Sequence, residues 1–169
     1  MGSQEVTDWQ GKHVTVAGLG VSGIPAAKVL HGLGAVVTVV NDGDDERSRA
    51  QAAELEALGI TVRLGDGATL PEGTELIVTA PGWKPDKPLF AAAAAADVPV
   101  WGDVELAWRL RGPDAAPWLA VTGTNGKTTT VQMLASILTG GGGGAAARGG
   151  RASPPARPTL RANWPGSDL

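Results

Sequence analysis

The residues best suited to chemistry follow one another in the segment Gly123-Thr124-Asn125-Gly126-Lys127-Thr128-Thr129. Glycines let backbone N–H groups converge on phosphate oxygens, and a lysine can neutralise the β- and γ-phosphates of a nucleoside triphosphate. A hydroxyl directly after that lysine is a typical magnesium ligand. We therefore predict that all seven residues bind ATP, that Thr128 binds Mg²⁺, and that Lys127 and Thr128 are catalytic.

The match to a phosphate-binding loop is approximate. The strict pattern has a glycine five positions before Gly126, where this chain has Val121. The alternative interpretation is a tight turn that carries a surface lysine. The flanking sequence favours the loop, because the apolar run 118–121 is typical of a buried strand and apolar residues repeat at helical spacing from Val131 to Leu138.

A second glycine-rich turn, Gly18-Leu19-Gly20-Val21-Ser22-Gly23, lies between a predicted strand over 13–17 and a predicted helix over 22–33. The next strand, 36–40, ends at Asn41 and Asp42, roughly 20 residues beyond the turn, where ribose-binding carboxylates usually lie. This spacing indicates a nucleotide site. In the alternative interpretation, the glycines serve only the close packing of helix on strand.

The elements around these turns alternate between strand and helix. We predict a helix over 45–58, strands over 60–64 and 76–79, a helix over 89–96, a strand over 98–101, and a helix from 102. This order predicts an α/β fold: a Rossmann-like, mostly parallel sheet with helices on both faces, followed by the first strand, loop and helix of a P-loop ATPase domain.

Composition narrows the class of protein. The chain has 169 residues, 43% of them hydrophobic, and no cysteine, which excludes disulfides and thiolate metal sites. No apolar run approaches about 20 residues, and the polar start lacks a signal-peptide core. We expect a soluble, cytoplasmic protein without a membrane partner.

The net charge of −3 conceals a break in composition. Residues 140–169 hold four arginines and one aspartate, a net +3 that leaves −6 for residues 1–139. The tail is rich in Gly, Ala, Arg and Pro, cannot build a core, and is predicted to be disordered. It is either a natural basic segment or the product of a reading frame lost near Thr139. We favour the latter and expect no nucleic-acid partner, because aromatic residues other than Trp164 are missing from the tail.

The motifs also occur in the order of a known family. The turn at 18–23, Thr79-Ala80-Pro81-Gly82, Gly102-Asp103-Val104-Glu105-Leu106 and the loop at 123–129 resemble those of the Mur ligases, over residues 7–139. Within that family, Ala-Pro-Gly followed by Gly-Asp-Val-Glu-Leu is most similar to the D-glutamate-adding branch. The resemblance implies an ATP-dependent amide ligase of peptidoglycan precursor synthesis. ATP would phosphorylate the carboxylate of UDP-N-acetylmuramoyl-L-alanine, and the amine of D-glutamate would attack the acyl phosphate.

The resemblance also implies domains and a substrate site. Residues 1–112 would form a Rossmann-like domain that binds UDP rather than NAD, 113–139 would begin a truncated central ATP-binding domain, and 140–169 would be the tail. The diphosphate would contact Gly20, Val21, Ser22 and Gly23. The uridine would be held by Asn41 and Asp42, and Ala80, Pro81 and Gly82 would lie beside the uracil. Ala80 replaces the serine of the family, so one hydrogen bond to the substrate would be lost.

The family's further metal-binding acids, histidine, carbamylated lysine and C-terminal domain have no counterpart here, and after Thr139 no lysine, histidine or glutamate occurs. We therefore predict that this chain alone has no ligase activity. Two other functions remain open. One is an NAD(P)-type Rossmann binding module, and the other is a non-catalytic nucleotide-binding protein whose tail recruits a partner.

The other conspicuous residues are expected to be structural. We predict that Trp101 and Trp108 pack in or beside the core, that Trp9 and Trp164 are exposed, and that Trp83 borders the nucleotide base. His13 and His31 are expected to pack or to lie at the surface. The acidic run 42–46 could bind a cation, but a solvated helix start explains it more simply.

Overall fold

The computed structural model describes residues 8–112, 115 and 117–140. Of the predicted disordered tail, residues 141–169, which include Trp164, lie outside the described residues, whereas Gly140 ends a helix. The chain divides into two compact units, Met1–Ala115 and Ala116–Leu169. The elements of the first unit are β1 (His13–Ala17), α1 (Gly23–Gly32), β2 (Val36–Asn41), α2 (Glu46–Glu56), β3 (Thr61–Leu64), β4 (Leu76–Thr79), α3 (Pro88–Ala95), β5 (Val100–Gly102) and α4 (Asp103–Arg109). The second unit contains α5 (Lys127–Gly140).

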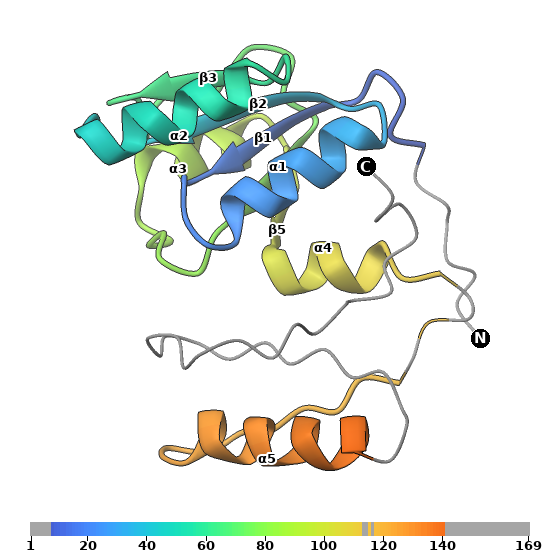
Figure 1. Ribbon diagram of the computed structural model, residues 1–169. Coiled ribbons are helices and arrows are strands. Elements are labelled where there is room, and N and C mark those ends of the chain that lie inside the picture. The colour runs from blue at the N-terminus through green and yellow to red at the C-terminus, as the bar shows by residue number, and fades with distance from the viewer. Residues whose placement is uncertain (1–7, 113–114, 116, 141–169) are drawn as a thin grey trace. The chain divides into compact units, whose positions relative to one another are not determined.

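The first unit is a five-stranded sheet in the order β3-β2-β1-β4-β5 with every pairing parallel. β1 is central: Val16 lies opposite Val39 on one side and Val78 on the other. Figure 1 shows α1 and α2 on one face of this sheet and α3 on the opposite face. The predicted Rossmann-like α/β fold with helices on both faces is confirmed.

Two hydrophobic cores lie on the two faces, because successive strand residues point to opposite sides. The larger core joins strand residues such as Val16 and Val39 to Leu30 of α1, Leu55 of α2 and Leu106 of α4. The smaller core joins Ala17, Val40 and Ile77 to α3. Each fully buried leucine stabilises the fold by about 1.5–3 kcal/mol relative to an exposed one. The central strands are therefore packed on both faces.

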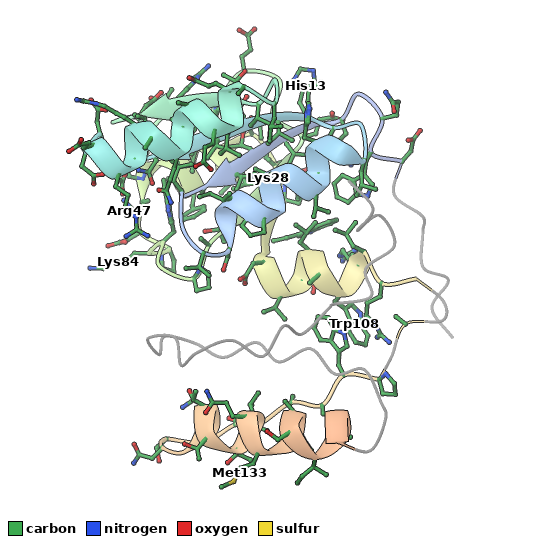
Figure 2. The ribbon with its side chains drawn as sticks, viewed as in Figure 1. His13, Lys28, Arg47, Lys84, Trp108 and Met133 are labelled. Atoms are coloured by element: carbon green, nitrogen blue, oxygen red, sulfur yellow. The ribbon has the colours of Figure 1, made fainter. Side chains whose placement is uncertain are left out.

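The tryptophan predictions are only partly correct. Trp101 packs partly buried against the larger core, as predicted. Trp9, predicted to be exposed, is 7% exposed and meets Trp101 edge-on, with ring centroids 6.2 Å apart. Trp108, predicted to pack in or beside the core, is 45% exposed and carries the Arg111 guanidinium 4.2 Å from its ring centroid. The reason is its position on α4: Asp103 and Leu106 are the buried residues of that helix, and Trp108 points away from the sheet (Figure 2).

The second unit differs from prediction at its first element. Residues 117–122 form no strand, and no second strand lies among the described residues of this unit to pair with them. An extended segment without a neighbour lacks the ladder of hydrogen bonds that defines a strand. The apolar run 118–121 is therefore not sufficient to predict a strand. Leu119 is 62% exposed. The predicted helix is present as α5, with Met133 (labelled in Figure 2) and Ile137 exposed. Within the described part of the chain, no helix is long and apolar enough to cross a membrane.

Candidate functional site

The predicted substrate residues of the first unit lie at one edge of the sheet. All five strands are parallel, so their carboxyl ends share an edge. The strand order reverses beside β1, because β2 and β3 follow on one side and β4 and β5 on the other. Such a switch point leaves a crevice in which ligands of α/β proteins bind. Three loops leave from this edge: the glycine turn, the Asn41-Asp42 segment, and Ala80-Pro81-Gly82.

The glycine turn needs glycine at two positions for structural reasons. Gly18 has a φ of +107°, and its N–H donates to the Val40 carbonyl oxygen at 2.8 Å. A Cβ at Gly23 would overlap the Gly18 carbonyl oxygen. Gly20 is different, because nothing lies within 4 Å of the place where its Cβ would be. Close packing therefore requires a glycine at position 23. It does not require one at position 20, which faces open space.

The beginning of α1 suits an anion. No acidic residue occupies its first turn, and the N-cap residue Ser22 makes no side-chain capping bond to the helix. Helix N-termini carry partial positive charge and N–H groups without helical partners. Val21 is 90% exposed at the tip of the turn. A diphosphate at this point would meet backbone donors without displacing an acid.

The two candidates for the uridine contact, Asn41 and Asp42, have different surroundings. Asn41 Oδ1 accepts from the Leu19 N–H at 3.2 Å, and Nδ2 donates to the Gly43 carbonyl oxygen at 2.9 Å. Asn41 therefore holds the glycine turn against its own loop. The Asp42 side chain is 55% exposed and pairs with Lys87 Nζ. Sequence reasoning left this choice open, and it missed Lys87, which is 45 positions away from Asp42 in the chain.

The third loop lies beside the glycine turn, at the carboxyl end of β4. The Ala80 N–H donates to the Ala17 carbonyl oxygen at 3.2 Å, and the Trp83 N–H donates back to the Ala80 carbonyl oxygen at 3.1 Å. Pro81 and Gly82 are exposed. The Trp83 indole lies beside Gly18, so it is close to the predicted nucleotide site.

The remaining acids of the run 42–46 serve α2. Asp45 Oδ1 caps this helix by accepting from the Ser48 N–H at 2.8 Å, a bond that lowers the pKa of Asp45. A hydrogen bond from Arg49 at 2.8 Å lowers the pKa of Asp44. The helix-start interpretation is confirmed. Over the described ranges, no three His, Cys, Asp or Glu side chains gather as metal ligands, and neither His13 nor His31 belongs to such a group.

The loop at 123–129 is described within the second unit. Gly126 has a φ of +76°, which favours glycine, and the Thr130 N–H donates to its carbonyl oxygen at 2.9 Å. Lys127 begins α5, whose first turn contains no acid. Its Nζ reaches back over the loop to the carbonyl oxygens of Gly123 and, at 3.4 Å, Thr124. Thr128 is half-buried, whereas Asn125 and Thr129 are exposed. The Lys127 ammonium group and the N-terminus of α5 thus lie at the same short loop.

Known proteins resemble this chain over most of its length. It is 92% identical over 132 residues to the UDP-N-acetylmuramoylalanine–D-glutamate ligase of Streptomyces avermitilis, and 84% identical over 134 residues to that of Streptomyces coelicolor. Each match covers 78% of this chain, and the chain spans only 28% of the length of each enzyme. No protein-family model matches the chain.

Solved structures resemble it more distantly. The UDP-N-acetylmuramate:L-alanyl-γ-D-glutamyl-meso-diaminopimelate ligase of Neisseria meningitides has a TM-score of 0.49 at 30% identity, over 78% of this chain and 40% of that one. The UDP-N-acetylmuramate–alanine ligase MurC of Thermotoga maritima has a TM-score of 0.48 at 25% identity, over 76% of this chain and 29% of that one.

Proposed function

We propose that this chain, a relative of the UDP-N-acetylmuramoylalanine–D-glutamate ligases (MurD) that spans 28% of their length, is the N-terminal part of such a ligase. The complete protein would use ATP to join D-glutamate to UDP-N-acetylmuramoyl-L-alanine in the cytoplasm, during peptidoglycan precursor synthesis. The observation that carries this proposal is the 92% identity over 132 residues to the Streptomyces avermitilis enzyme, which is accompanied by the parallel, Rossmann-like sheet of the first unit.

The five-stranded unit would bind the UDP part of the substrate. The diphosphate would lie at the start of α1, against the backbone of Gly20, Val21, Ser22 and Gly23. The open space at Gly20 and the absence of an acid from the first turn of α1 support this placement. Asp42 is the better candidate for the uridine, because Asn41 already uses its amide to hold the glycine turn. Ala80, Pro81 and Gly82 would line the other side.

The loop at 123–129 would hold ATP and Mg²⁺. Its donor set fits a polyphosphate: a glycine loop with positive φ, a helix start and one ammonium group. Bound ATP supplies the phosphoryl group that activates the substrate carboxylate. Lys127 would exchange the carbonyl oxygens of Gly123 and Thr124 for phosphate oxygens, and Thr128 would contribute its hydroxyl to the metal. Thr124, Asn125 and Thr129 would complete the contacts.

This chain alone would lack ligase activity. It spans 28% of the relatives' length, and the second unit exposes apolar side chains such as Leu119, before the loop, and Ile137 of α5. A phosphate loop without the further acids that hold magnesium and without a site for D-glutamate can bind a nucleotide but cannot complete the transfer.

A thermal-shift titration of the chain tests the substrate class. We expect UDP and UDP-N-acetylmuramoyl-L-alanine to raise the melting temperature, because they bind only the folded unit, and NAD⁺ to have no effect. A rise with NAD⁺ alone would contradict the proposal and favour an NAD-type module. Gly20→Asp and Gly20→Asn form a matched pair, since nothing lies within 4 Å of that Cβ position. The aspartate should abolish the UDP effect by charge repulsion, and the asparagine should keep it.

A further inference from the structure

Three side chains beside the glycine turn form one contact cluster. Lys87 Nζ pairs with the Asp42 carboxylate and lies 4.8 Å from the centroid of the Trp83 ring. Asp42 belongs to the loop between β2 and α2, and the other two belong to the loop between β4 and α3. The cluster therefore joins two loops at the carboxyl edge of the sheet, where a nucleotide is expected.

The Trp83 indole is held at both ends. A Cβ at Gly18 would lie 2.6 Å from its Nε1, and a Cβ at Gly67 would lie 2.9 Å from its Cη2. Phe90 meets the ring edge-on, with centroids 6.2 Å apart and an interplanar angle of 77°. The indole thus reaches from the turn after β1 to the loop after β3. A ring at this position lies at the edge of the proposed nucleotide site.

Gly67 shows that the chain keeps space for this cluster. Its φ is not in the left-handed region, so its backbone does not require glycine. A Cβ at this position would nevertheless overlap the Asp42 carboxylate and crowd Trp83. The missing side chain therefore leaves room for the carboxylate and the indole together.

We propose that Trp83 and Lys87 determine which nucleoside this edge accepts, an inference that rests on the proposed UDP site. Trp83 provides the flat surface against which the base lies, since aromatic side chains stack on any base. Lys87 is a positioning residue that directs the Asp42 carboxylate toward the ligand. A carboxylate accepts hydrogen bonds and cannot donate them. Placed opposite N3 of the base, it favours uracil, whose N3 carries a hydrogen, over cytosine, whose N3 is an acceptor.

The first test titrates UDP into Trp83 variants, with binding followed by calorimetry and by tryptophan fluorescence. UDP should quench the fluorescence of the unaltered chain. Trp83→Leu should lose this quenching and bind UDP about ten-fold more weakly, and Trp83→Phe should bind between the two. Trp108→Leu removes an exposed indole on α4. UDP should bind this variant and quench its fluorescence as in the unaltered chain. Unchanged affinity in Trp83→Leu would overturn the inference, and so would tighter binding, which would mean that the indole obstructs the site.

The second test measures the ratio of UDP affinity to CDP affinity. Lys87→Met should bring this ratio toward one, because Asp42 loses the partner that orients it, and Lys87→Arg should restore it. Lys84→Met is the matched control, since Lys84 is an exposed lysine of the same loop (Figure 2) and should leave the ratio unchanged. A ratio in Lys87→Met equal to that of the unaltered chain would overturn the role of Lys87.

The two proposals fail in different ways. If the unaltered chain binds neither UDP nor UDP-N-acetylmuramoyl-L-alanine, the proposed function fails and this inference fails with it. If UDP binds but the variants behave like their controls, only the inference fails. Melting temperatures establish that each variant is folded. Lys87→Met and Trp83→Phe keep the test decisive should Trp83→Leu unfold.

Discussion

At the scale of single residues, Gly23 and Gly20 differ although they belong to the same turn. We predict that Gly23→Ala lowers the free energy of unfolding by about 1–3 kcal/mol, because the new Cβ would overlap the Gly18 carbonyl oxygen and the backbone would have to move. Gly20→Ala should change it by less than about 0.5 kcal/mol, since its Cβ would meet nothing within 4 Å. Urea denaturation measures both. Equal effects at the two positions would contradict the packing role of Gly23.

The sequence predicts where the candidate site lies in the fold but not the contacts of its individual side chains. The spacing of the glycines and the acid that follows β2 predict that these residues lie at the same edge of the sheet, because parallel strands end together. The spacing could not separate Asn41 from Asp42, whose roles depend on contacts to Leu19 and Lys87. It also gave no sign of Lys87 or Gly67, because their partners are distant in the chain and follow no repeat.

At the scale of elements, the start of α2 should depend on pH. The folded state lowers the pKa of Asp45 below its usual 3.8, through the bond from the Ser48 N–H. The stabilisation is therefore fully present above the unfolded pKa and is lost as the pH falls through the lower folded value. We predict that Asp45→Asn is less stable than the unaltered chain at pH 7 and that the difference shrinks as the pH falls below 3.8 and through the lower folded pKa of Asp45.

Urea denaturation at a series of pH values measures this difference. Asparagine keeps an oxygen that can cap the helix, so the variant isolates the contribution of the charge. Glu54→Gln removes an exposed carboxylate from the same helix and controls for net charge. A difference for Asp45→Asn that grew as the pH fell would have the wrong sign and would contradict the assignment.

An apolar run in the sequence predicts a strand correctly in the first unit but not in the second. Apolar runs such as 36–40 and 76–79 predict strands to within one residue, since parallel strands are buried on both faces. The run 118–121 has the same signal but is not a strand. Neighbouring strands supply a ladder in the first unit, whereas no strand of the described residues pairs with 117–122. Trp9 was misjudged for a related reason: its burial depends on Trp101, which is far away in sequence.

At the scale of the whole molecule, the two units should differ in stability. We predict that the amide hydrogens of β1, β2 and β4 exchange slowly and those of residues 117–122 exchange much faster, because no strand of the described residues pairs with that segment. Hydrogen exchange followed by mass spectrometry resolves the two regions. ATP with Mg²⁺ should slow exchange over 124–130 in the unaltered chain and not in Lys127→Ala. Strong protection of 117–122 without nucleotide would contradict the prediction.

The strands form the core of the first unit and the loops would contact the ligand, so the two can change at different rates in evolution. The strands contribute mainly valine, leucine and isoleucine side chains to the two cores, whereas Asp42, Trp83 and Lys87 belong to loops that leave the carboxyl edge. Substitutions in these loops can change ligand preference while the β-sheet keeps its packing. Over evolutionary time, one scaffold can therefore acquire new ligands by drift in a few loop positions, and the loop at 80–87 is where orthologues with different preferences should differ first.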